Sequence, residues 1–379
     1  MASMQQSNTR VAASSPERLS GSDLDGLRPA KAVIAGAIAG SLARSLDGPI
    51  IPMLMKLSGP TVLVLIVQTF VGVAETYFVS FLGTDALAGV ALVFPVLMLM
   101  TMMSNGGVGG GVASAVARAV GAGRMQDADA LVMHAIVLAI LFGLAFTIGI
   151  LGFGRALYSA LGGSGDALTA ALQYSSFVFG GAALAWIVNL LQASLRGAGD
   201  VRIPALVIFA GAVIVVPLSP ALIFGIGPLP QLGIAGAGAA VVIYYALATV
   251  VLMAYMRSTR SPVRLVRTRL EWRLFKDILS VGGISAIGTV QANLTVAIVT
   301  AMAGAFGTDA LAGFGLASRL DYLLIPLLFG LGTATVTMVG ANVGAGDFDR
   351  ARRIGWTAAL LAAGVTEAIG LLAAMFPHA

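Results

Sequence analysis

The sequence has no cysteine and only two histidines, His134 and His378. Without cysteine the chain forms no disulfide, carries no thiolate nucleophile and cannot build a Cys-based zinc site. Two histidines also exclude a histidine-rich metal centre, so we expect neither a metal nor an organic cofactor.

Charged residues are scarce as well. Asp, Glu, Lys and Arg make up 10% of the chain, whereas soluble domains carry about 25%. Hydrophobic residues make up 58%, and the mean hydropathy is +0.95. A chain of this composition cannot cover its surface with polar groups that bind water. The composition therefore predicts an all-α protein that crosses a membrane several times.

Nine stretches are long and apolar enough to span a bilayer, which needs about 20 residues. They cover roughly residues 60–82, 86–116, 130–153, 168–193, 203–225, 232–256, 277–306, 310–341 and 354–376. The loops on one side, with residues 1–56, carry 20 of the 22 lysines and arginines, and the opposite loops carry only Arg155. The positive-inside rule therefore predicts a cytoplasmic N-terminus and residue 379 outside, in a bacterial inner membrane.

The segments before and between the spans are polar. We predict a disordered cytoplasmic tail over residues 1–31 and an interfacial helix over 32–56 that leads into a six-span bundle ending near residue 256. A basic linker over 257–276 then runs along the inner membrane surface to a second bundle, residues 277–379. Basic cytoplasmic loops are ordinary in membrane proteins, so the net charge of +5 indicates topology and no nucleic-acid partner.

Two motifs recur in the same order. GTDALAG (83–89) returns at 307–313, an offset of 224, and AVGAGRMQDADA (119–130) matches NVGAGDFDRARR (342–353), an offset of 223. Six spans separate the copies, so both have the same orientation, which implies parallel halves related by an axis along the membrane normal. The second copy holds counterparts of spans one to three only, so the expected parent has six plus six spans, of which the last three are missing here.

With these motifs in place, the chain resembles the multidrug and toxic compound extrusion (MATE) family. The residues that carry the resemblance are GPTVL (59–63), AETYFVSFLGTDALAGVALVFP (74–95), LRGAGDVRIP (195–204), LIFGIGPLPQLGIAGAGAA (222–240) and FGTDALAG…GANVGAG. The resemblance implies twelve spans in two bundles around a V-shaped cavity. It also implies export of amphipathic, often cationic compounds in exchange for protons or sodium, by a protein that is a monomer when complete and that contacts membrane lipid.

Glu75 is the candidate coupling residue. A carboxylate at the centre of a span costs about 2.5 kcal/mol or more, so it needs a partner, a bundle interior or a proton. Glu75 also occupies the position where similar MATE proteins carry a span-one aspartate. The alternative is a hydrated, passive glutamate near the outer mouth.

The fifth and sixth spans depart from the family pattern. Val215 and Ser219 stand where the family carries an asparagine and an aspartate, and Val241 stands at its sixth-span threonine. Sodium needs several oxygen ligands, so these departures favour a proton as the coupling ion.

Other polar residues in the spans are candidates for the substrate cavity or for helix pairing: Arg319, Asp321, Gln291, Asn293 and Glu367. His134, at the inner end of span three, is expected to be structural. An apolar drug-binding surface is one interpretation of a further set of residues, and a lipid-facing or core position is the other. The set is Tyr77, Phe78, Phe81 and Met98–Met103.

The repeated motifs are interpreted as structural. We expect Asp85 and Asp309 to cap the long helices that follow Gly83 and Gly307. The glycines at inner helix ends and turns are Gly121, Gly123, Gly197, Gly199, Gly344 and Gly346. In SNGGVGGGVAS (104–114), the pairs Gly106/Gly110 and Gly107/Gly111 predict close helix approach.

Three other readings are weighed. A flippase for a lipid-linked sugar, as in relatives of the same superfamily, would want more cationic cavity residues than Arg319. A membrane-embedded enzyme would need paired aspartates or an HExxH helix, and the sequence has neither. The third is a truncated remnant or half-assembly that does not transport. Without the last three spans, polar faces of the second bundle would be exposed to lipid.

Overall fold

The computed structural model describes residues 48–305 and 308–375, without the side chains of 303–323 and a few neighbours. The predicted tail over 1–31, most of the predicted interfacial helix, and Gly307 lie outside the described residues. The described part is helical: α2 (Ile50–Ser80), α3 (Thr84–Met102), η1 (Met103–Gly107), α4 (Val108–Gly121), α5 (Met125–Ala160), α6 (Gly165–Gly180), α7 (Ala182–Gly197), α8 (Arg202–Phe224), α9 (Ile234–Arg257), α10 (Trp272–Ala305), α11 (Thr308–Gly344) and α12 (Phe348–Met375).

These helices confirm the predicted spans. Within the described residues, eight helical segments are long and apolar enough to cross a membrane, and α6 with α7 forms a ninth span bent by 48°. The bend falls at Gly181, where a Cβ would overlap the side chain of Val242 in α9. The second span is also irregular, because α3 passes through the π-helical turn η1 into α4.

Span one starts earlier than the sequence predicts. α2 begins at Ile50 and continues through Pro60, so residues 50–56 are the first turns of the span. The sequence predicts an interfacial segment here because Pro52 and Lys56 interrupt the apolar residues. Its inner turns are instead buried against α11 and α12, through Leu54 and Leu57.

The inner motifs end their helices as predicted. α4 ends at Gly121, α7 at Gly197 and α11 at Gly344, and a glycine with positive φ follows each: Gly123 (70°), Gly199 (85°) and Gly346 (82°). The expected aspartate caps are wrong at the first copy. Gly83, with φ 104°, holds the N-cap position of α3, and Asp85 is an exposed residue of its first turn. In the first turn, the negative charge of Asp85 still interacts favourably with the dipole of α3. Asp309 lies inside α11, and its side chain is outside the description.

The two copies of the repeat pack on each other reciprocally. A Cβ at Gly121 would overlap the carbonyl oxygen of Ala341, and a Cβ at Gly344 would overlap that of Arg118. Residues 118 and 341, like 121 and 344, are related by the offset of 223. Gly340 meets Ala117, again its own counterpart. We call this contact between α4 and α11 the inner seam, and its symmetry agrees with the parallel repeat.

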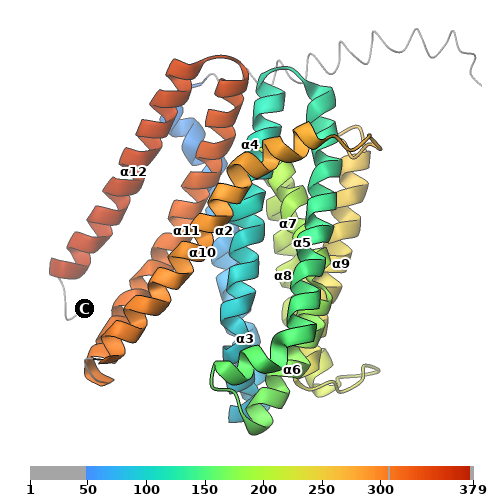
Figure 1. Cartoon of the computed structure of the whole chain (residues 1–379), viewed down its shortest axis with the longest axis vertical. Coiled ribbons are helices and arrows are strands. Elements are labelled where there is room, and N and C mark those ends of the chain that lie inside the picture. Colours follow the sequence, from blue (N-terminus) through green and yellow to red (C-terminus); the bar gives the residue numbers. More distant parts are fainter. Residues whose placement is uncertain (1–47, 306–307, 376–379) are drawn as a thin grey trace, which may run out of the picture.

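The first spans of the two copies cross to the opposite half. α2 packs extensively on α11, and α10 packs extensively on α4 and η1. The close contacts are again related by the repeat, since Gly330 meets Val62 and Gly107 meets Ala286. Figure 1 shows α10 crossing in front of α4, while α10 and α11 spread away from α3 and α6 toward the outer end. The predicted close approach at Gly107 and Gly111 is thus made with α10.

Candidate functional site

Glu75 lies in the outer half of α2 and is half-buried. The hydroxyl of Tyr174, in α6, donates to Glu75 Oε1 over 3.5 Å, a long distance for such a bond. Tyr174 is 3% exposed, so its hydroxyl is held inside the first bundle. The carboxyl predicted as the coupling group therefore has a partner from span four.

A second phenol flanks this pair. Tyr245, in α9, lies within electrostatic range of both Glu75 and Tyr174, and its ring centroid lies 5.0 Å from that of Tyr244, with the two rings tilted at 43°. A carboxyl beside two phenol groups can take up and release a proton while its hydrogen-bond partners stay in place. This cluster joins spans one, four and six.

Two of the positions that depart from the family pattern, Val215 and Ser219, are buried residues of α8. Val215 is 4% exposed and Ser219 is 1% exposed. Within the described part of the chain the Ser219 hydroxyl has no hydrogen-bond partner. Among the described residues there is no group of three or more His, Asp or Glu side chains that could hold a metal ion.

The second-copy candidates whose side chains are described lie apart from one another. Asn293 donates to Met102 Sδ over 3.7 Å, which brings α10 to the methionine-rich stretch of α3, while Gln291 is exposed. Glu367 lies on the exposed face of α12, with no ion pair among the described residues. The side chains of Arg319 and Asp321 lie outside the description.

Aromatic side chains gather at the outer end of α2. Tyr77 and Phe81 are exposed, their ring centroids lie 5.0 Å apart, and Phe81 meets Phe224 of α8 at 6.3 Å. Such rings suit either a membrane interface or an apolar ligand, so the drug surface stays a prediction.

His134 has the structural role predicted for it. It is fully buried, its Nδ1 lies 2.8 Å from the carbonyl oxygen of Ala130, and its Nε2 accepts the backbone N–H of Glu271 over 2.8 Å. An Nε2 that accepts cannot carry a proton, so the ring is neutral and Nδ1 donates. His134 thus fixes the linker between the bundles to α5.

Sequence reasoning missed three polar residues inside the first bundle. Tyr174 and Tyr245 are the groups around Glu75, and Asn189 donates to the Ser104 hydroxyl over 2.8 Å, which joins α7 to the π-helical turn. The signal available for each was a polar side chain within an apolar span. That signal does not say which helix the side chain faces.

Nine spans in two related halves, with a paired carboxyl inside the first, define a transporter built from parallel repeats. A family model described as MatE matches residues 60–221 and 285–379. The chain therefore belongs to the MATE family, as the motifs indicate.

One of the similar proteins is named a transporter and two are named probable multidrug resistance proteins. The chain is 30% identical over 315 residues to the FAD transporter of Shewanella oneidensis, covering 81% of this chain and 68% of that protein. It is 26% identical over 334 residues to the probable multidrug resistance protein NorM of Thermotoga maritima, covering 86% and 70%. The chain spans 68% of the length of the Shewanella FAD transporter and 70% of this NorM. It spans 60% of the length of the probable multidrug resistance protein YoeA of Bacillus subtilis.

The fold is shared with solved MATE structures. An outward-facing multidrug resistance MATE transporter superposes with a TM-score of 0.78 at 27% identity, over 88% of this chain and 74% of that one. A transporter of the same superfamily from Pyrococcus furiosus, described as having a binding pocket of reverse polarity, also gives a TM-score of 0.78 at 27% identity, covering 88% and 73%.

Proposed function

We propose that this protein is a proton-coupled antiporter that exports amphipathic, often cationic compounds across the bacterial inner membrane, with Glu75 as the coupling carboxyl. The observation that carries the proposal is the placement of Glu75 beside Tyr174 and Tyr245, in a span of a MATE protein. Release of the proton leaves a carboxylate that attracts a cation, so proton and substrate compete for the same group.

The proton is preferred over sodium because the cluster offers one carboxyl and two phenols. Valine stands at 215 and 241, and of these three positions only Ser219, whose hydroxyl is buried, carries a side-chain oxygen. A sodium ion would lack most of its ligands there.

The test is ethidium transport by the purified chain in liposomes, driven by a pH gradient and, separately, by a sodium gradient. We expect transport with the pH gradient only, and at least a tenfold loss in Glu75→Gln, which keeps the shape but holds no exchangeable charge. Tyr174→Phe removes one hydrogen bond and should cost about three- to tenfold, in line with roughly 0.5–1.5 kcal/mol.

The matched control is Asp85→Asn. Asp85 is an exposed carboxylate ten residues further along the chain, at the outer end of α3, so this variant should transport as the parent does. Unaltered pH-driven transport by Glu75→Gln would sink the proposal, and so would equal loss in Asp85→Asn.

A second substrate class is favoured by one comparison. The Shewanella relative with 30% identity is named an FAD transporter, so flavin dinucleotide belongs in the same liposome assay. If the Glu75→Gln variant still transports flavin dinucleotide in liposomes, this would indicate an anionic substrate whose transport does not need the Glu75 carboxyl.

A further inference from the structure

The inner third of α10 is built into the hydrophobic core of the first half of the molecule. Leu274 is 2% exposed and Ile278 is fully buried, and both belong to the same core cluster as residues of α4, α5 and α7. Buried residues of α11 and α12 belong to a second cluster with Leu54 and Leu57 of α2. By packing, residues 272–283 are part of the first half, although the sequence counts them as span seven.

Polar contacts fix the same segment from two sides. Arg118 of α4 donates to Asp277 Oδ1 over 2.7 Å and to the Asp277 carbonyl oxygen over 3.1 Å. Arg273 pairs with Asp127 of α5 over 3.0 Å. The linker before α10 is held to α5 as well, since Asp129 Oδ1 accepts the N–H of Arg264 over 2.6 Å and His134 accepts that of Glu271.

The inner seam between α4 and α11 is held differently. Gly121 and Gly344 lie against the backbone of the other helix, and Gly340 lies against the Cβ of Ala117. No ion pair joins α4 to α11 among the described residues. Thr337 of α11 donates one hydrogen bond across to the carbonyl oxygen of Arg196 in α7, over 3.0 Å.

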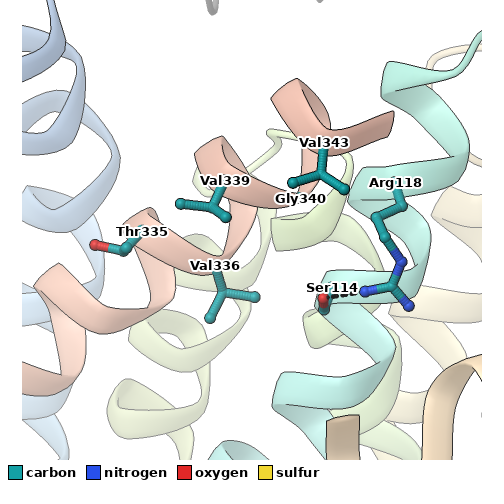
Figure 2. A pocket seen from close by; sticks show the side chains of 7 residues that line it. All are labelled: Ser114, Arg118, Thr335, Val336, Val339, Gly340 and Val343. Carbon is teal, nitrogen blue, oxygen red and sulfur yellow. Dashed lines mark hydrogen bonds between the residues drawn. The ribbon is translucent and has the colours of Figure 1, made fainter. Parts of the chain in front are cut away.

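The seam is also hollow at one place. A space of about 230 Å³ is lined by Ser114 and Arg118 of α4 and by Thr335, Val336, Val339, Gly340 and Val343 of α11. Figure 2 shows Val336, Val339 and Val343 on one wall, and Arg118, bonded to Ser114, on the other. A contact with a void along it forfeits part of its dispersion energy, and no ion pair between α4 and α11 among the described residues has to break when it opens.

Beyond its inner third, α10 is suited to bending. Gly283 and Gly288 face open space, so packing does not require a glycine at either position. Each glycine lowers helix stability by about 1 kcal/mol relative to alanine. Thr289 and Asn293 donate to the carbonyl oxygens of Ser285 and Thr289, and such bonds favour helix bending.

We propose that residues 272–283 of α10 stay docked on α4 and α5 in both the outward-open and the inward-open state, that α10 bends between Gly283 and Gly288, and that the inner side opens at the seam between α4 and α11. This inference rests on the proposed transport function. It differs from a simple rocking of two halves in that span seven is divided between them.

The first experiment measures distances and needs no transport. Because the chain has no cysteine, two introduced cysteines carry the only spin labels. The Ala122→Cys/Ala345→Cys pair spans the seam, and the Gln126→Cys/Lys276→Cys pair spans the contact of α5 with α10, with all four positions at the inner end and exposed. Distances are recorded in liposomes at acidic and alkaline pH, with and without ethidium.

We expect the seam pair to gain a second, longer population as conditions change, while the Gln126/Lys276 distance stays single and constant. A Gln126/Lys276 distance that lengthens together with the seam overturns the proposal. So does a seam distance that stays single under every condition.

The second experiment ties each contact covalently with one flexible, reducible bis-thiol reagent. Asp127→Cys/Arg273→Cys replaces the ion pair of α5 with α10, and Ser114→Cys/Val339→Cys links the two walls of the hollow. We expect the first tie to retain ethidium transport and the second to abolish it until the link is reduced. Reversible loss with the first tie contradicts the proposal, whereas absence of transport before linking concerns the proposed function and leaves the distance result standing.

Stiffening the hinge gives a third measurement. Gly283→Ala and Gly288→Ala place a methyl group in open space, so the double variant should unfold at the same or a slightly higher temperature. We expect it to lower the longer seam population at least threefold, and an unchanged population would count against bending at this place. Gly110→Ala in α4, also in open space, is the matched control and should leave the population unchanged.

Discussion

The two copies of the repeat share their glycine contacts, yet they hold their first spans in different ways. The inner end of α2 docks on α11 and α12 through buried leucines, Leu54 and Leu57. The inner end of α10 docks on α4 and α5 through ion pairs and backbone hydrogen bonds as well as Leu274 and Ile278. The same geometry is therefore maintained by two chemistries. Apolar burial dominates at α2, where Arg350 adds a hydrogen bond to the carbonyl oxygen of Gly48 over 2.6 Å, whereas ion pairs between side chains hold α10.

The copies differ at the proposed coupling position too. Glu75 in α2 corresponds, at the offset of 224, to Val299 in α10, which is 40% exposed. The first half thus carries a carboxyl where the second carries an aliphatic side chain. Symmetry of the backbone does not require symmetry of function.

The largest expected effect breaks what the copies share. Gly121→Leu and Gly344→Leu each push a side chain into the backbone of the other half, at Ala341 and Arg118. Overpacking typically costs about 1–3 kcal/mol and occasionally more. A leucine that meets backbone rather than a movable side chain belongs to the costlier cases, so we expect these losses to exceed that of a core truncation. Thermal unfolding in detergent should show similar losses for both, and Gly110→Ala should show none. Unequal losses would mean that the seam is not symmetric in energy.

A smaller effect separates the two kinds of docking. Leu54 is fully buried, so Leu54→Ala should destabilise the protein by about 2–5 kcal/mol through lost burial and the cavity left behind. Since the leucine side chain carries no charge, the loss of unfolding temperature should be the same at low and high salt. A loss that shrinks strongly with salt would mean that the substitution also disturbs the contact of Arg350 with Gly48 at this end of α2.

The smallest effect concerns the polar docking. Asp277→Asn removes the ion pair with Arg118. The Arg118 side chain is 21% exposed and the Asp277 side chain is 38% exposed. Pairs this accessible contribute about 1 kcal/mol or less, and salt screens them. The difference in unfolding temperature between Asp277→Asn and the parent should therefore narrow as salt rises, unlike that of Leu54→Ala. A difference that is constant over the salt range would assign the contribution of Asp277 to packing.

Much of the architecture is predictable from the sequence because bilayer thickness and the repeated motifs leave few choices. The nine spans, the parallel repeat and the glycine turns at 123, 199 and 346 follow from run length, offset and residue type. The π-helical turn at Met103–Gly107 and the bend at Gly181 do not, since they arise from contacts with Asn189 and Val242 that lie far away in the chain. Periodicity also cannot say that α10 packs on the first half, because an apolar face looks the same whichever helix covers it.

The candidate site was predictable in part. A glutamate in an apolar span is conspicuous, so Glu75 stands out, whereas Tyr174 and Tyr245 resemble ordinary span residues until the fold brings them to it. Asp85 was misassigned because glycine with positive φ, which accepts the turn before α3 without strain, takes the cap position.

The reciprocal inner seam has an evolutionary consequence. Gly121 on Ala341 and Gly344 on Arg118 is the pattern of a two-fold interface, in which each surface meets a copy of itself. A single ancestral repeat could close the same seam by forming a parallel homodimer, and duplication with fusion would preserve it. In a homodimer every mutation appears twice, whereas the fused chain changes one copy at a time, and that freedom is what allows glutamate at 75 and valine at 299 in one molecule.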